Sequence, residues 1–576
     1  MDSLRILGCF FLLCGLFFPT GQCFQGEDGQ QIKPLVKENE RKLEPKENWM
    51  KAEQEDLLKS LRIQDNYGVA KNTILFIGDG MGISTLTAMR ILKGQKKGNP
   101  GEEERLNFED FPALGLAKTY ATDRQIAESG TTGSAIQTGV KTRYNLLAYD
   151  DTVEWANCSS ENPEAQLPSL RDWAEEAGKS TGIVTTARIN HATPAGAYAK
   201  TCSRKWEDDS NLPPDALGKC KDIAAQLIER GQNITVLLGG GRRGLMPETE
   251  ADPEYPSKTG RRKDGRNLIE EWKKDKANRQ MKAKYVWNKE DFDSIDVSKT
   301  DYLMGLFENS HMMYELDREK DAEPKEPSIA EMTNKAIRML QKNDKGFFLL
   351  VEGARIDHGH HAGKARLAIE DGVAFEEAVG EALKLTDPKD TLIVVTADHS
   401  HVFMMGGYPP RGNPLFGLTT ALPGQDKEPA TDKMPYTTIV YGNGPGYALG
   451  ANGRANITGV NTSDPNYKAQ APVPVVDETH SAEDVAIYAL GPMAHLFHGL
   501  HDNAYIAHVM SYAACMGPNK DHCEKPKVVT LPSGLTCITD PNNLIHPLLI
   551  SGSESDVTIS LTLVFLCVSL CQFFQF

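Results

Sequence analysis

The sequence predicts an α/β protein, a three-layer sandwich around a central, largely parallel β-sheet, with an irregular insertion. Short apolar runs that end in turn residues alternate with longer segments of helical periodicity along most of the chain. Alternating strands and helices favour a parallel sheet covered by helices. With 576 residues, of which 40% are apolar and 25% charged, the chain has the length and composition to bury a large core.

The elements follow one another in this order. A charged N-terminal segment, 37–62, has a helical pattern, and we expect a surface helix or arm there. The predicted strands are 73–77, 181–185, 235–238, 346–351 and 392–396, and the predicted helices are 167–177, 223–230, 329–341 and 365–385. Residues from about 405 to 475 are rich in Gly, Pro, Asn and Thr, which predicts an irregular insertion or small subdomain.

The N-terminal residues carry the pattern of a secretion signal. Arg5 is followed by the apolar run Ile6–Phe18 and by small residues at Gly21 and Cys23. This run is too short to span a membrane as a helix, and we expect residues 1–23 to be removed as a signal peptide.

The C-terminal residues predict a lipid anchor. Leu561–Phe576 is almost wholly apolar and has no basic flank. A GPI signal has small residues, a polar spacer of about 8–12 residues and an apolar tail of about 10–20, and this order begins at Ser551. We therefore expect a mature domain over 24–551, removal of 552–576, and display on the extracellular face of the plasma membrane. A tail-anchored helix is the alternative.

Cysteines, glycosylation sequons and charge agree with secretion. Of the eleven cysteines, six lie between the two processed ends: Cys158, Cys202, Cys220, Cys515, Cys523 and Cys537. Their spacing forms no Cys-x-x-Cys metal motif, so we expect disulfides, for which six cysteines allow 15 pairings. The sequons begin at Asn157, Asn233, Asn456 and Asn461. The net charge of -16 argues against nucleic-acid binding.

Acidic and imidazole side chains follow predicted strands at the point where each strand ends. They are Asp79, Glu352 and the pair Asp398 and His399. In open α/β sheets, ligands bind beyond the carboxyl ends of the strands. A single acid at such a place often only caps the next helix. Three such strand ends predict a functional site.

The segment 352–361, Glu-Gly-Ala-Arg-Ile-Asp-His-Gly-His-His, indicates metal binding. Carboxylates and imidazoles together suit Zn²⁺. Asp357 and His361 are four residues apart, so one helical turn directs both side chains at one ion. His480 is a further candidate ligand. A solvated polar loop is the alternative interpretation of the segment.

A candidate nucleophile lies in the segment 128–135, Glu-Ser-Gly-Thr-Thr-Gly-Ser-Ala. Its small residues allow close approach of the backbone, and Ser129 would begin a helix, where anions are favoured. Taken alone, the segment is a serine N-cap. The glycine-rich stretch 239–244 lacks the Lys-Ser/Thr of a P-loop, and we expect a turn there.

Together these residues resemble one family, the metazoan alkaline phosphatases, over nearly the whole mature chain. The matching motifs are Ile-Gly-Asp-Gly-Met-Gly from Ile77, the Ser129 segment through Gly139-Val-Lys, Asn-His-Ala-Thr-Pro-Ala-Gly-Ala-Tyr-Ala from Asn190, residues 351–361, Thr-Ala-Asp-His-Ser-His from Thr396 and Glu-Thr-His from Glu478. The resemblance implies hydrolysis of small-molecule phosphate monoesters through a phosphoserine intermediate. It also implies a homodimer, with the N-terminal arm and a crown-type insertion near the interface.

The resemblance further implies ligand sets for two zinc ions and one magnesium ion. One zinc would be held by Asp357, His361 and His480, and the other by Asp79, Asp398, His399 and Ser129. Magnesium would be held by Asp79, Thr193 and Glu352. Ser129 would be the nucleophile and Arg204 would hold the phosphate, while His191 and His358 would lie close behind the metal ligands.

A calcium site and two disulfides follow from the same resemblance. The calcium ligands would be Glu254, the Phe307 carbonyl, Glu308 and Glu326, where Glu326 replaces the usual Asp. The disulfides would be Cys158–Cys220 and Cys515–Cys523, which leaves Cys202 and Cys537 unassigned. Glu128 stands where the family has Asp before the nucleophile.

Two alternatives remain open at the level of sequence. A GPI-anchored nucleotide phosphodiesterase of the same superfamily would bind two zinc ions but lack the magnesium set of Thr193 and Glu352. A non-catalytic member would bind partners at the surface through the 405–475 insertion. The Cys-x-Pro-x-Arg site of a sulfatase is absent from the sequence. Every expected ligand and the nucleophile are present, which favours catalysis.

Overall fold

The computed structural model of the chain describes residues 44–320, 323–419, 430–451, 453–523, 527–530 and 536–539. The expected signal peptide, 1–23, and the expected anchor region from Ser551 onward lie outside these residues. No helix among the described residues combines the length and the apolar character needed to cross a membrane.

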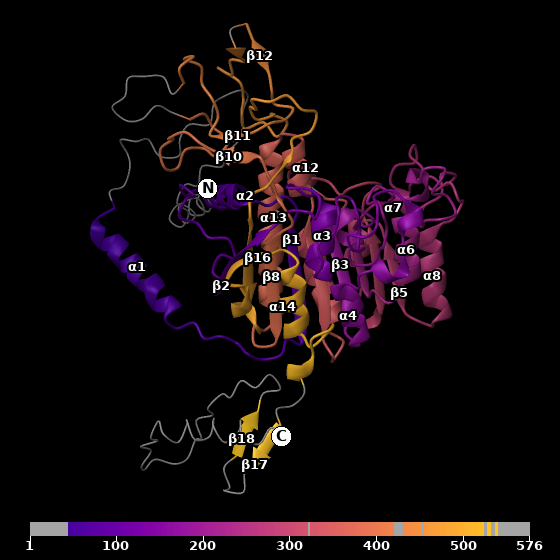
Figure 1. Ribbon diagram of the computed structural model, residues 1–576. Helices are drawn as coiled ribbons and strands as arrows, with labels where there is room; N and C mark the ends of the chain where they lie inside the picture. The colour runs from indigo at the N-terminus through magenta and orange to yellow at the C-terminus, as the bar shows by residue number, and fades with distance from the viewer. Residues whose placement is uncertain are drawn as a thin grey trace, which may run out of the picture.

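A ten-stranded sheet forms the centre of the fold (Figure 1). Its strands are β1 (Asn72–Gly78), β2 (Ala113–Lys118), β3 (Ser180–Arg188), β4 (Val236–Gly240), β5 (Ala283–Val286), β6 (Tyr302–Leu306), β7 (Phe347–Gly353), β8 (Thr391–Ala397), β15 (Val485–Leu490) and β16 (Gly499–Asp502). Their spatial order is β16-β2-β15-β8-β1-β7-β3-β4-β6-β5. Only β15 runs antiparallel to its neighbours, β2 and β8. The predicted α/β fold with a largely parallel sheet is therefore confirmed.

Helices cover both faces of this sheet. They are α1 (Lys46–Ser60), α2 (Ile83–Lys96), α3 (Ser129–Thr138), α4 (Leu170–Glu176), α5 (Ala192–Ala195), α6 (Ile223–Arg230), α7 (Arg242–Leu245), α8 (Leu268–Asn278), α9 (Lys289–Asp293), α10 (Glu315–Arg318), α11 (Ile329–Leu340), α12 (Arg355–His361), α13 (Ala365–Leu385) and α14 (Tyr505–Ala513). Helices α2, α11 and α13 pack together on one face, while α3, α4 and α14 pack on the other. Helix α1 lies apart from the sheet and has no buried residue (Figure 1).

The central strands are buried along their whole length, which explains why their sequences are continuous apolar runs. Every residue of β1, β7 and β8 is buried. Strands covered on both faces by helices lose the polar alternation of a half-exposed sheet. Strand β2, in contrast, alternates buried and exposed residues near the edge of the sheet.

The insertion at about 405–475 is irregular, as its composition predicts. Its only regular elements among the described residues are short: β10 (Phe403–Met405) pairs with β11 (Ile439–Tyr441), and β12 (Leu449–Gly450) pairs with β13 (Gly453–Arg454). Figure 1 shows β12 at the top of the view and the pair β10 and β11 below it, nearer to α12. A further pair, β17 (Lys527–Thr530) and β18 (Thr536–Thr539), lies near the C-terminus.

The stretch 239–244 differs from the expected simple turn. Gly239 and Gly240 end β4, and Arg242 begins the one-turn helix α7. Gly241 between them has a φ of 102°, a left-handed conformation that glycine adopts without strain. The glycines thus join a strand directly to a helix.

Candidate active site

Three adjacent parallel strands bring the predicted acidic side chains to one edge of the sheet. In the order β8-β1-β7, Asp398 follows β8 and Asp79 follows β1 directly. Glu352 lies within β7, one residue before its end, and pairs in register with Ile77 of β1. The expectation that Glu352 follows its strand was therefore wrong, because the strand extends two residues beyond Val351, to Gly353. All three carboxylates are fully buried.

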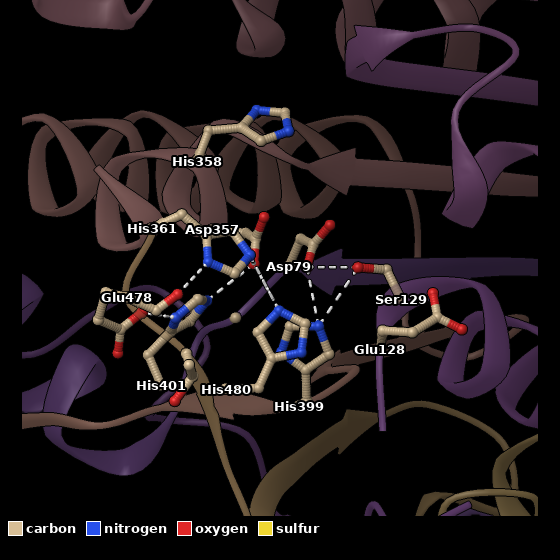
Figure 2. A network of polar contacts seen from close by, with 12 residues as sticks. Asp79, Glu128, Ser129, Asp357, His358, His361, His399, His401, Glu478 and His480 are labelled. Atoms are coloured by element: carbon tan, nitrogen blue, oxygen red, sulfur yellow. Dashed lines mark hydrogen bonds and ion pairs between the residues drawn. The ribbon is translucent and has the colours of Figure 1, made fainter. Parts of the chain in front are cut away.

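Ser129 is the first residue of α3, and its hydroxyl faces the same edge of the sheet. Its Oγ lies 3.3 Å from Asp79 Oδ1 and 3.3 Å from His399 Nε2 (Figure 2). Glu128 is the N-cap and accepts hydrogen bonds from the backbone N–H groups of Gly130 and Thr131. The helix therefore holds Ser129 firmly, with a carboxylate and an imidazole at its hydroxyl.

Around Ser129, the side chains of the zinc set expected from Asp79, Asp398 and His399 converge. His399 Nε2 lies 3.3 Å from Asp398 Oδ2 and 3.5 Å from Asp79 Oδ1. Burial, followed by repulsion from Asp398, raises the pKa of Asp79 well above its usual value. Burial also lowers the pKa of His399 well below its usual value. A cation at this position would relieve the repulsion and leave His399 neutral, as a metal ligand must be.

The other expected zinc set, Asp357, His361 and His480, also converges on one point. Asp357 Oδ1 lies 3.3 Å from His361 Nε2 and 3.4 Å from His480 Nε2, and these two nitrogens are 3.0 Å apart. His361 Nδ1 lies 2.5 Å from the Glu478 carbonyl, and His480 Nδ1 lies 2.8 Å from the Ala127 carbonyl. Each Nδ1 therefore donates to a carbonyl, so each Nε2 presents a lone pair to the shared point. This donor set fits Zn²⁺.

His401 supports this set and was not singled out by the sequence. Its Nε2 lies 2.8 Å from Asp357 Oδ1 and its Nδ1 lies 2.5 Å from Glu478 Oε2 (Figure 2). Strand β9 (Ser400–His401) pairs with β14 (His480–Ser481), which places His401 opposite His480. The signal was its place in the Thr-Ala-Asp-His-Ser-His motif, but its contact with Asp357 depends on this pairing of distant segments.

The expected magnesium set is recognisable by buried oxygens without partners. Asp79 Oδ2, Thr193 Oγ1 and Glu352 Oε1 are buried in the described part of the structure and have no hydrogen-bond partner of good geometry. Burial and the nearby Asp398 and Asp357 raise the pKa of Glu352 to about 7. Buried oxygens left unpaired are costly, and a hard cation with oxygen ligands would satisfy them.

Arg204 lies beside the candidate nucleophile and is held on both edges. Its Nη1 forms an ion pair with Glu128, and its Nη2 lies 3.1 Å from His191 Nε2. The His358 ring lies 5.6 Å from the His191 ring, and Figure 2 shows it apart from the contacts that join Ser129, His399 and His480. His191 therefore contacts Arg204 directly, whereas His358 lies next to His191.

The expected calcium ligands lie in one region, and two of them, Glu254 and Glu308, already bond protein groups. Arg242 Nη2 donates to Glu254 Oε2 at 2.8 Å, and the Tyr255 hydroxyl donates to Glu308. Glu326 is buried, with a pKa raised to about 8 by burial and then by Glu308 and Glu254. Phe307 directly precedes Glu308 after β6.

The structure contains the disulfides Cys158–Cys220 and Cys515–Cys523. Cys202 is a free, buried thiol, and the side chain of Cys537 lies outside the description. Of the sequon residues, Asn233, Asn456 and Asn461 are exposed and Asn157 is partly exposed.

The fold and this site define a class: a hydrolase with a largely parallel α/β sheet and a candidate serine nucleophile among carboxylates and imidazoles of the kind that bind metal ions. The comparisons with known proteins identify the family. Residues 70–516 match the family model described as alkaline phosphatase. The tissue-nonspecific alkaline phosphatase of Gallus gallus is 49% identical over 489 residues, which are 84% of this chain and 92% of that protein. The alkaline phosphatase of Gadus morhua is 48% identical over 488 residues, which are 84% of this chain and 99% of that protein.

The chain therefore belongs to the alkaline phosphatase family, whose members hydrolyse phosphate monoesters. Among solved structures, the alkaline phosphatase of Thermus thermophilus superposes with a TM-score of 0.55 at 22% identity, covering 78% of this chain and 92% of that one. At this identity the superposition supports the fold alone.

Proposed function

We propose that the protein hydrolyses phosphate monoesters through a phosphoserine intermediate on Ser129, at a centre for two zinc ions and one magnesium ion. The observation that carries the proposal is the position of Ser129 Oγ, 3.3 Å from both Asp79 Oδ1 and His399 Nε2. The unpaired oxygens of the magnesium set favour this function over a phosphodiesterase-like alternative, and the complete set of ligands favours it over a non-catalytic surface protein.

The residues would hold the ions as three overlapping sets. One zinc would take Asp357, His361 and His480, the second zinc Asp79, Asp398, His399 and Ser129, and magnesium Asp79, Thr193 and Glu352. When bound, the ions supply positive charge that lowers the pKa of the serine hydroxyl and stabilises the leaving oxygen.

The chain itself contributes nucleophile, orientation and charge. Ser129 Oγ attacks phosphorus while its proton leaves toward Asp79 Oδ1, the carboxylate within its reach. The bond from phosphorus to the ester oxygen breaks, and the leaving alkoxide takes a proton from water and departs as the alcohol. Arg204 offers a planar guanidinium whose fork matches two phosphate oxygens. The capping of α3 by Glu128 fixes Ser129 as the helix begins, so that attack needs little reorientation of the hydroxyl. Water then cleaves the phosphoserine and releases inorganic phosphate.

Location and assembly are further parts of the proposal. The signal-peptide pattern, the four sequons and the C-terminal GPI pattern support a glycosylated protein anchored at the extracellular face of the plasma membrane, with attachment at Ser551. The exposed helix α1 supports a homodimer, because Trp49 and Leu57 on it are 53% and 51% exposed.

Calcium at Glu254, Phe307, Glu308 and Glu326 is proposed as a structural ion, for which Glu326 supplies an unpaired Oε2.

The test is release of p-nitrophenol from p-nitrophenyl phosphate at alkaline pH by secreted protein that ends before Ser551. We expect turnover that is lost with a metal chelator and in Ser129→Ala. Ser134→Ala is the matched control, because this hydroxyl lies in the same helix but donates to the Gly130 carbonyl at 2.6 Å. Metal-loaded protein that is inert, or a Ser129→Ala variant that keeps full activity, contradicts the proposal.

A further inference from the structure

A group of basic side chains lies next to the candidate active site, over the neighbouring strands of the sheet. We call it the distal cluster: Arg188, His191, His311, Arg355 and His358. Arg188 ends β3, His191 precedes α5, His311 lies after β6, and Arg355 and His358 lie in α12. Because β3 follows β7 in the sheet, the cluster continues the edge on which Asp79 and Glu352 lie.

The three imidazoles of the distal cluster are close enough to contact one ligand. The His311 ring centre lies 4.1 Å from that of His358 and 5.1 Å from that of His191. One nitrogen from each ring lies within 4.8 Å of the others. A group of three histidines at this spacing suits either a metal ion or an anion, and their hydrogen bonds decide between the two.

Two of the imidazoles present only N–H donors to the cluster. A guanidinium has donors and no acceptor, so an imidazole nitrogen beside it must accept. His191 Nε2 accepts from Arg204 Nη2 at 3.1 Å, and His358 Nδ1 accepts from Arg355 Nη1 at 3.1 Å. The second nitrogen of each ring therefore carries hydrogen. His191 is only 7% exposed, and its Nδ1 has no hydrogen-bond partner among the described residues.

His311 meets a donor at both ring nitrogens. The Arg188 backbone N–H lies 3.3 Å from His311 Nδ1, and Arg188 Nη1 lies next to His311 Nε2. A neutral imidazole has a single acceptor nitrogen. In one of these two contacts, therefore, an N–H group of His311 faces an N–H group of Arg188. An acceptor oxygen next to this pair would give the unmatched N–H group a partner.

The charges around the distal cluster favour an anion as well. Arg188 is paired with Glu207 at 2.6 Å, but Arg355 has no ion-pair partner in the described part of the chain. The Arg355 guanidinium instead lies 3.7 Å from the centre of the Tyr314 ring, and its Nε has no hydrogen-bond partner. The guanidinium groups repel a cation, and the lone pairs that a metal ion needs are already occupied. A metal site is therefore disfavoured.

We propose that the distal cluster binds a second anionic group of the substrate, so that the site prefers phosphate monoesters whose leaving group carries another phosphate. The inference rests on the proposed function, in which Ser129 and Arg204 hold the transferred phosphate. Arg204 connects the two sites, because one edge of its guanidinium is held by Glu128 next to Ser129 and the other contacts His191. His311 and Arg355 are specificity-determining residues in this proposal and take no part in the chemical step.

The test compares two substrates that differ by one phosphate, fructose 6-phosphate and fructose 1,6-bisphosphate, on the metal-loaded protein. We expect kcat/KM for the bisphosphate to exceed that for the monophosphate about tenfold or more, beyond the factor of about two for two reacting phosphates. The difference should reside mainly in KM and should shrink as salt screens the charges.

Three variants test whether His311 and Arg355 cause the preference for the bisphosphate. His311→Ala and Arg355→Gln should each lower the bisphosphate to monophosphate ratio about tenfold, by loss of a charge-assisted contact. His311→Asp should abolish the preference, because its carboxylate would occupy the donors of Arg188 itself. Arg338→Gln is the control for loss of charge, since Arg338 is exposed on α11 and bonds only Asn334, at 2.8 Å.

The outcomes are distinct. A ratio of about two in the unmodified protein, or variants that lower kcat/KM for both substrates equally, would overturn the proposal while the phosphatase activity stands. A ratio that falls equally in Arg338→Gln would also overturn it, because the effect would then be one of net charge. If the unmodified protein turned over neither substrate, the proposed function itself would fail.

Discussion

Arg204 and Glu128 form a buried ion pair beside the candidate nucleophile. The Glu128 carboxylate also accepts the backbone N–H groups of Gly130 at 2.7 Å and Thr131 at 3.0 Å. Burial alone would raise the pKa of Glu128, but Arg204 and the Thr131 hydroxyl hold it below its usual value. One charged carboxylate therefore caps α3 and fixes the guanidinium relative to Ser129.

The first prediction concerns the charge of this carboxylate. Glu128→Gln keeps a capping oxygen but no longer neutralises Arg204. We expect the free energy of unfolding to fall by about 1–3 kcal/mol, as for a lost hydrogen bond to a charged group. We also expect inorganic phosphate to inhibit more strongly, because the guanidinium charge becomes available to it. The measurements are chemical unfolding and the inhibition constant of phosphate.

A matched control exists elsewhere in the chain. Asp222 caps α6 through Ala225 N–H and pairs with Arg262 at 2.8 Å, so it has the same two roles far from Ser129. Asp222→Asn should lower stability without changing the inhibition constant. Weaker inhibition by phosphate in Glu128→Gln would contradict the argument.

The second prediction concerns Gly80, which follows Asp79, a proposed metal ligand. Gly80 has a φ of 70°, and a Cβ there would lie 2.5 Å from the ring of His401. We expect Gly80→Ala to push His401 away from Asp357 and to lower activity at least about tenfold, since misplaced ligands are costly. The free energy of unfolding should fall by more than the cost of the left-handed backbone alone, which is about 1–2 kcal/mol.

Gly98→Ala isolates that backbone cost. Gly98 has a φ of 81°, and a Cβ there would meet nothing within 4 Å. This variant should lose stability but keep its turnover of p-nitrophenyl phosphate. Equal losses of activity in the two variants would show that His401 is not the cause.

The central strands could be predicted from the sequence because strands that are buried on both faces consist almost entirely of apolar residues. Strands β1, β7 and β8 are buried on both faces and read as unbroken apolar runs. Strand β15 was not predicted, and its place between β2 and β8 depends on long-range antiparallel pairing that no local pattern specifies. Strand β16, at the edge of the sheet, has no buried residue and left no such mark.

Some residues of the candidate site could likewise be predicted from the sequence, and others could not. Asp79, Asp398 and Asp357 could be selected from strand ends and helical spacing, while their assignment to particular ions came from the family resemblance. His401 and His311 could not be selected. His401 reaches Asp357 only because β9 pairs with β14, and His311 reaches His358 only because a loop after β6 folds onto α12. Contacts between distant segments leave no local pattern in a sequence.

The third prediction concerns removal of the metals. Without cations, the buried carboxylates repel one another, so a chelator should lower the melting temperature. The pKa of Glu352 is raised to about 7, above its value of about 4.3 in an unfolded chain. Between these values the folded state binds more protons, so the stability of the metal-free protein should fall as pH rises from 5 to 7.

The contribution of Glu352 to this pH dependence can be measured. Glu352→Gln should reduce the fall in melting temperature of the metal-free protein between pH 5 and 7, since its amide does not titrate, while Asp79, whose pKa is also raised, keeps part of the fall. The metal-loaded unmodified protein should not show the fall, because bound cations keep the carboxylates ionised in that range. A metal-free protein that gains stability toward pH 7 would refute the assignment.

The fourth prediction concerns stability at alkaline pH and Lys200. This lysine is 2% exposed at its side chain, and its Nζ lies 3.3 Å from Asp172 Oδ2. Burial lowers its pKa to about 8, below the value of about 10.4 in an unfolded chain. Between these values the unfolded chain binds more protons, so Lys200 makes the protein more stable as pH rises from 8 to 10.

Lys200→Met should therefore change the slope of stability with pH as well as its level. Because the charged form of the buried lysine is the disfavoured one, the difference in stability between the unmodified protein and the variant should shift in favour of the unmodified protein from pH 8 to pH 10. Melting temperatures at pH 8 and 10 should rise less, or fall more, in Lys200→Met than in the unmodified protein. Lys273→Met, at an exposed helix position, should keep the original slope. Identical slopes in all three proteins would mean that Lys200 stays charged in the folded state, with water or Asp172 compensating for its burial.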